Sequence, residues 1–125
     1  MRSDVTTLRS SLGVTEIAKL FQGTLTGRGV HFGEIEEDAF SSIDRKPAFS
    51  VVASCDKSMG SWAVQLYVYD DGETRLAELC AMYHSAFSRA MGGTKNTYSK
   101  AAGAKNVQNV LAALQSTDSS ATIES

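Results

Sequence analysis

The sequence predicts an α+β domain, in which a small antiparallel sheet of two to three strands carries helices mainly on one face. Two neighbouring stretches carry this prediction. In residues 62–69 apolar side chains alternate with others, which is the pattern of a strand with one buried face. In residues 76–91 apolar side chains recur at three-and-four spacing, which is typical of one side of an α-helix. A strand, an acidic turn and a long central helix are therefore expected at the centre of the fold.

Length and composition indicate one domain, residues 1–115, followed by a flexible Ser/Thr-rich tail, residues 116–125. The hydrophobic fraction of 42% and the charged fraction of 21% are those of an ordinary globular protein. No apolar run approaches the roughly 20 residues that span a bilayer, and the first residues do not resemble a secretory signal. We therefore expect a cytoplasmic protein that does not contact a membrane.

The segments before the centre predict helices and one short strand. Asp4 is placed to cap a short helix, and a second helical pattern covers residues 14–23. Val30 and Phe32 then alternate with small or polar residues, which indicates a loop that runs into a short strand. The acidic run 34–38 is expected to be a solvated turn of helix or a loop.

The remaining segments predict a hairpin and a final helix. Residues 48–54 alternate like a strand, and the short polar connection to Trp62 favours an antiparallel pair. Asp70 and Glu73 are spaced like a capping box at the start of the central helix. Residues 101–115 have the apolar spacing of a last helix, which Gly103 weakens in its first turn.

The second face of the central strand is the candidate surface for a protein partner. Gln65, Tyr67 and Tyr69 alternate with the core residues, so they remain on an open side if helices cover only one face. Tyrosines bury a large area at a low entropic cost and keep a hydroxyl group for hydrogen bonding. The alternative is that a terminal helix packs on this face and buries them.

Cys80 is the candidate for catalysis or metal binding. On a helix, Cys80 and His84 would lie four residues apart and reach one zinc ion, but only Cys55 and His31 remain as further soft ligands. A Cys-His nucleophile pair would also lack an orienting third group with a recognisable signature. We therefore expect buried thiols in a reducing compartment, with no metal and no cofactor, although two cysteines leave one disulfide open.

The only clearly basic stretch is residues 92–105, which holds Lys95, Tyr98, Lys100 and Lys105 without an acidic residue. Together with Arg28 it is the candidate surface for nucleic acid. The net charge of −2 argues against a protein whose main task is to coat nucleic acid, because phosphate contacts need a concentrated basic surface. Residues 23–33 are rich in glycine, but their spacing does not match the known phosphate-binding loops, so an ordinary turn is expected.

These observations predict a small, non-enzymatic protein-binding module, such as a regulator or inhibitor of a larger assembly, that self-associates as a homodimer through its sheet. The alternative is a nucleic-acid-binding module that uses the lysine-containing segment. A third class, less favoured, is a small enzyme with Cys80 as the nucleophile. No pair of carboxylates is predicted to share a catalytic cleft, because runs of acidic residues are usually solvated.

Overall fold

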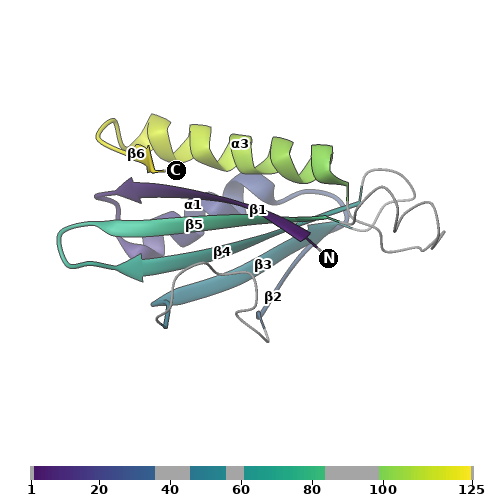
Figure 1. Cartoon of the computed structure of the whole chain (residues 1–125), viewed down its shortest axis with the longest axis horizontal. Helices are drawn as coiled ribbons and strands as arrows, with labels where there is room; N and C mark the ends of the chain where they lie inside the picture. The colour runs from purple at the N-terminus through teal and green to yellow at the C-terminus, as the bar shows by residue number, and fades with distance from the viewer. Residues whose placement is uncertain (1, 36–45, 56–60, 84–98, 125) are drawn as a thin grey trace.

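The computed structural model describes residues 2–35, 46–55, 61–83 and 99–124 of the chain (Figure 1). In chain order the elements are β1 (Arg2–Ser10), α1 (Val14–Leu25), β2 (Val30–Gly33), β3 (Phe49–Cys55), β4 (Trp62–Asp70), β5 (Arg75–Tyr83), α3 (Lys100–Thr117) and β6 (Thr122–Glu124). The α+β class therefore holds.

All the strands in the described residues belong to one antiparallel sheet of six strands, in the order β2-β3-β4-β5-β1-β6. The expectation of a small sheet of two to three strands is therefore wrong. The additional strands come from segments at both ends of the chain and from the segment that follows the acidic turn. In the sheet, β1 lies beside β5, so the chain crosses the sheet through α1 before β2 begins.

The segment after the acidic turn is a strand and not the start of a long helix. β5 pairs with β1 along its whole length, and on its other side its residues 75–82 pair with β4. Asp70 and Gly72 belong to a hairpin turn, in which the N–H of Asp71 donates to the carbonyl of Thr74 at 2.9 Å and Gly72 has a φ of 90°. The capping box expected at Asp70 and Glu73 is therefore also wrong. Residues 84–91, the second half of the expected helix, lie outside the described residues.

The N-terminal segment is likewise a strand, so the short helix expected after Asp4 is wrong. Leu8 of β1 lies opposite Ala77 of β5 and is fully buried. Val5, Thr6 and Thr7 are β-branched, and such side chains fit a pleated sheet better than a helix.

Several other predictions are confirmed. The helix expected at residues 14–23 is α1, and the helix expected at 101–115 is α3. The short strand with Val30 and Phe32 is β2. The strand expected at 48–54 is β3, and it pairs with β4 in the predicted antiparallel direction.

Residues 116–125, expected as a flexible tail, contain further structure. α3 continues to Thr117, and residues 122–124 form β6 beside β1. The link between these two elements is a turn in which the N–H of Ala121 donates to the carbonyl of Asp118 at 3.1 Å.

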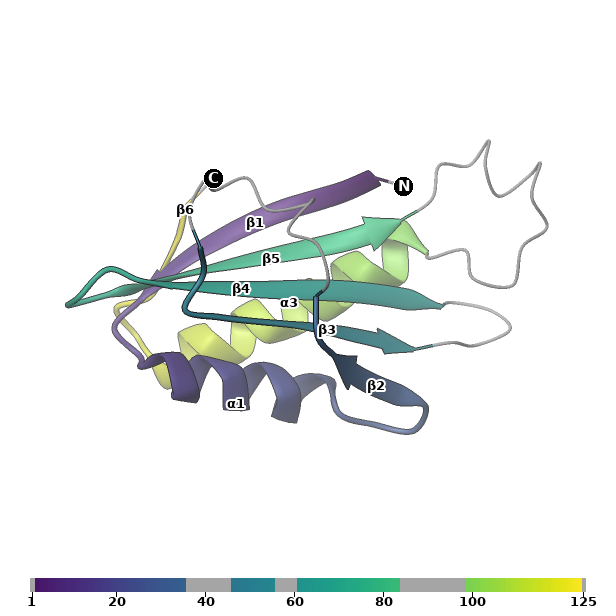
Figure 2. The same cartoon turned by 90° about the horizontal axis from the view of Figure 1, so that it is seen from below.

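The main core lies between the sheet and the two helices. α1 and α3 contact each other and cover the same face of the sheet (Figure 2). The alternating set of β4 expected in the core points towards them: Trp62, Val64, Leu66 and Val68. These strand residues pack with Ile17 and Phe21 of α1 and with Val110 and Leu114 of α3 in one buried cluster.

Candidate functional site

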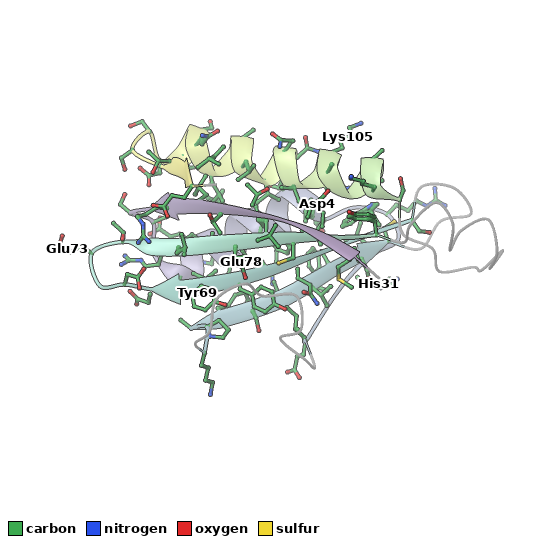
Figure 3. All side chains as sticks on the ribbon, viewed as in Figure 1. Asp4, His31, Tyr69, Glu73, Glu78 and Lys105 are labelled. Carbon is green, nitrogen blue, oxygen red and sulfur yellow. The ribbon has the colours of Figure 1, made fainter. Side chains whose placement is uncertain are left out.

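The tyrosine face of β4 is buried within the chain. Gln65 is 6% exposed, Tyr67 is fully buried and Tyr69 is 1% exposed. The hydroxyl of Tyr67 donates a hydrogen bond to Oε1 of Gln65 at 2.8 Å. Figure 3 shows Tyr69 and Glu78 on the side of the sheet away from α3. The two faces of β4 were thus assigned correctly, but the second face is not an open surface.

The residues that pack on this second face come from neighbouring strands and from the segment after β2. Tyr67, Tyr69 and Cys80 form a small buried cluster, against which Ile35 and Leu76 pack. Among the described residues no helix takes part, because α1 and α3 both lie on the other face. The tyrosines are therefore part of a second core and do not lie on the accessible surface of this structure.

The two cysteines lie on opposite faces of the sheet. Cys55 belongs to the core under the helices, whereas Cys80 belongs to the second cluster. Both are buried and neither forms a disulfide, and a bond between them would have to pass through the sheet. Burial, with a smaller contribution from the charge of Glu78, raises the pKa of the Cys80 thiol to about 12. Cys80 is therefore a neutral thiol at physiological pH, which disfavours a role as a nucleophile or metal ligand.

The candidate metal ligands are not brought together. Cys80 lies on β5, and His31 lies exposed on β2 at the far side of the sheet. His84 lies outside the described residues. Within the described ranges, no group of three or more His, Cys, Asp or Glu residues is arranged to hold a metal ion.

The basic candidates are spread over different elements. Lys100 and Lys105 are exposed on α3, and Figure 3 shows Lys105 on the side of α3 away from the sheet. The ammonium group of Lys100 lies 3.9 Å from Oδ2 of Asp4 and 5.0 Å from the ring centroid of Tyr83. Arg28 lies exposed in the turn before β2. Lys95 and Tyr98 lie outside the described residues.

The glycine-rich segment is an ordinary helix end and turn, as its spacing indicated. Gly23 lies inside α1, and the N–H of Val30 donates to the carbonyl of Gly27 at 3.2 Å. Gly29 has a φ of 81°, a conformation that glycine adopts without the steric cost of a side chain. Of the acidic run that follows, residues 36–38 lie outside the described residues.

The outer side of β1 is the surface that the sequence did not reveal. β6 pairs only with Thr7, Leu8 and Arg9. We call the outer side of residues 2–6 the β1 edge, and within the described residues no strand pairs with it. The only large hydrophobic side chains that are exposed in the described part of the chain are Val5, at 41%, and Ile123, at 48%, and they lie on these two strands.

Charged and polar contacts hold β6 in place at the end of the β1 edge. Nε of Arg9 donates to Oε1 of Glu124 at 2.9 Å, and the hydroxyl of Thr7 donates to the main-chain carbonyl of Glu124. Nη1 of the same arginine also donates to Oδ2 of Asp71 and to Oγ1 of Thr74, each at 3.0 Å. Arg9 is thus fixed by the β4-β5 turn as well as by β6.

Sequence signals for this surface do exist. The β-branched run Val5, Thr6 and Thr7 favours a strand, and so does the pair Thr122 and Ile123 near the C-terminal end. Neither segment is long enough to show which strand it joins. The strands that pair with β1 and β6 are therefore seen only in the structure.

Comparisons with protein-family models, with curated proteins and with solved structures find no match for this chain. A search of the described residues for a helix long and apolar enough to cross a membrane also finds none. Function therefore has to be argued from the geometry of the chain itself.

Proposed function

We propose that this chain is a small, non-enzymatic protein-binding module of the cytoplasm, which binds an extended segment of a partner protein at the β1 edge. The observation that carries the proposal is the half-covered β1, whose residues 2–6 have no strand partner among the described residues. Such an edge presents main-chain N–H and C=O groups in the spacing that another strand needs. Strand addition of this kind is a common mode of peptide recognition.

The side chains on β1 favour this edge over the opposite one. Val5 is 41% exposed, so a partner side chain beside it would remove apolar surface from water. β2, the strand at the other end of the sheet, is only four residues long. Its apolar residues Val30 and Phe32 are half-buried against the main core, which leaves only His31 and Gly33 exposed.

A second copy of the chain fits the β1 edge less well than a different protein. A two-fold antiparallel pairing that uses all of residues 2–6 places the two copies of Asp4 opposite each other. Like charges directly opposite in a sheet are destabilising. The tyrosine route to a homodimer would need Tyr67 and Tyr69, which are buried within one chain. The proposed partner is therefore another protein.

The two cysteines support a cytoplasmic location and a non-enzymatic role. Cys55 and Cys80 form no disulfide, and reduced thiols suit a reducing compartment such as the cytoplasm. The raised pKa of Cys80 weighs against cysteine chemistry. Nucleic acid is disfavoured because Asp4 offsets the charge of Lys100, and because the net charge of the chain is −2.

The test compares how the parent chain, Val5→Lys and Gln108→Lys capture a partner from an extract of the native source. Val5→Lys places a charge at the edge, which is how natural proteins block unwanted strand pairing. Gln108→Lys adds the same charge on the exposed side of α3 and serves as the matched control. We expect the parent and Gln108→Lys to retain the same partner after nuclease treatment, and Val5→Lys to lose it while its circular dichroism stays unchanged.

Two outcomes would contradict the proposal. Equal capture by all three versions would show that the β1 edge is not the binding surface. Loss of the captured material on nuclease treatment, or on Lys100→Glu substitution, would favour the nucleic-acid alternative.

A further inference from the structure

β6 shows what kind of strand the outer side of β1 accepts. It is a three-residue strand whose side chains are all exposed, and it is held by its pairing with β1 and by the contacts of Glu124 with Arg9 and Thr7. The carboxylate of Glu124 accepts a hydrogen bond from Arg9. Ile123 lies opposite Leu8, on the side of the sheet that faces α3. An aliphatic residue followed by an acidic one is therefore the sequence that already fits the outer side of β1 at residues 7–9.

The groups that receive this strand are in place independently of it. Arg9 is held by Asp71 and Thr74, so its guanidinium stays at the edge when Glu124 leaves. The ion pair itself is exposed, with side-chain exposures of 33% for Arg9 and 46% for Glu124. Exposed ion pairs contribute little stability and are screened by salt. β6 is thus an occupant that a longer strand can displace.

The register of β6 also predicts what such a longer strand should carry. A strand that continues in the same direction beyond the position of Glu124 passes opposite Thr6, then Val5, then Asp4. The residue opposite Val5 follows the acidic residue by two positions, so both point to the same face. An aliphatic side chain there would cover exposed Val5, whereas an acidic side chain one position further would meet Asp4.

We infer that the partner segment replaces β6 beside residues 7–9, continues along the β1 edge, and carries an aliphatic residue, an acidic residue, any residue and a second aliphatic residue in succession. This inference rests on the proposed function and adds the chemistry of the partner. It also gives the C-terminal strand a role, because β6 competes for the half of β1 that contains Arg9. Weakening β6 then strengthens partner binding, since more of the chain has a free edge.

The test measures binding of a fluorescent peptide, Thr-Ile-Glu-Thr-Val-Thr, by anisotropy. Glu124→Lys in the full chain sets a second positive charge against Arg9 and weakens β6. Glu73→Lys makes the same charge change at an exposed residue of the β4-β5 turn and is the matched control. We expect Glu124→Lys to bind the peptide about ten-fold more tightly than the parent, and Glu73→Lys to bind like the parent.

Two further arms separate strand addition at this edge from non-specific binding. The peptide with Lys in place of Glu should not bind, because it would face Arg9. Combining Val5→Lys with Glu124→Lys should abolish binding of the original peptide, while circular dichroism shows that the variant is folded.

Equal affinity of the parent and Glu124→Lys would overturn the inference, and so would equal binding of the Glu and Lys peptides. Suppose that the peptide test fails in this way but Val5→Lys still captures no partner from the extract. The β1 edge then remains the proposed binding surface, and only the displacement of β6 is wrong. If Val5→Lys also retains the partner, the proposed function fails with it.

Discussion

Asp118, at the end of α3, connects three segments of the chain. Its Oδ2 accepts hydrogen bonds from the hydroxyl of Ser10 at 2.7 Å and from the N–H of Ser11 at 2.9 Å. Its Oδ1 accepts from the hydroxyl of Ser120 at 2.6 Å. The end of β1, the start of the α1 connection and the turn before β6 therefore meet at one buried carboxylate.

These hydrogen bonds predict a pH-dependent effect of Asp118→Asn. Donation from Ser120, and then from Ser10 and Ser11, lowers the pKa of Asp118 below the ordinary carboxylate range. A lowered folded pKa contributes stability that is present above the unfolded pKa and is lost as the pH falls through the folded pKa. The amide of Asn replaces one acceptor with a donor, so some of these bonds cannot form.

We therefore expect Asp118→Asn to lower the melting temperature at neutral pH, and the difference from the parent to narrow below about pH 4. Thermal unfolding followed by circular dichroism between neutral and acidic pH would measure this. Asp4→Asn, at an exposed carboxylate, is the control and should change little. A difference that stays constant or widens on acidification would contradict this account of Asp118.

At the scale of elements, α3 approaches the sheet closely at Gly103. A Cβ atom at Gly103 would lie 3.3 Å from the Cβ of Ala81 on β5, which is tighter than ordinary van der Waals contact. The sheet therefore leaves little room for a side chain at position 103. The low helix propensity of Gly103 is offset by this close packing.

We expect Gly103→Val to destabilise the fold by about 1 to 3 kcal/mol, because the larger side chain must displace β5 or α3. Ala104→Val, at the exposed neighbouring position, should cost less than about 0.7 kcal/mol, since only helix propensity changes. Urea unfolding of the two variants would compare them. Equal effects would mean that α3 does not pack against β5 at this point.

β5 has the sequence pattern of a helix because both of its faces are buried. Ala77, Leu79 and Ala81 face the main core, whereas Cys80 lies in the second cluster. When both faces of a strand are buried, apolar residues occur at odd and even positions, and some of them fall at helical spacing by chance. The Asp71-Gly72 pair between two apolar runs was the available hairpin signal.

At the scale of the whole molecule, both faces of the sheet are buried at its centre. Leu66 and Tyr67 are consecutive residues of β4, each fully buried, and they belong to different clusters. Within the described residues the stability of the fold therefore depends on two cores, and α1 and α3 cover one of them.

We expect Leu66→Ala to cost about 2 to 5 kcal/mol and Tyr67→Ala to cost about 3 to 5 kcal/mol, because each leaves a cavity in its own core. Chemical denaturation of the two single variants would measure both losses. If Tyr67→Ala were as stable as the parent while Leu66→Ala was destabilised, the second core would not contribute to folding, and an interface role for Tyr67 would regain support.

The sequence predicts correctly those elements whose pattern has one clear period. These are α1 and α3, the β3-β4 hairpin and the separation of Leu66 from Tyr67 on opposite faces of β4. It also indicated buried thiols at Cys55 and Cys80, because two cysteines without nearby ligands favour that state.

Only the folded chain reveals the identity of β1, β5 and β6, the burial of Tyr67 and Tyr69, and the open β1 edge. The physical reason is that a strand is stabilised by main-chain partners distant in sequence, whereas a helix satisfies its own hydrogen bonds locally. β1 pairs with residues more than sixty positions away, as Ser10 with Arg75 shows. The apolar pattern of one segment does not identify a strand partner that is distant in sequence. The number of strands in the sheet and its free edge therefore could not be deduced from the residues alone.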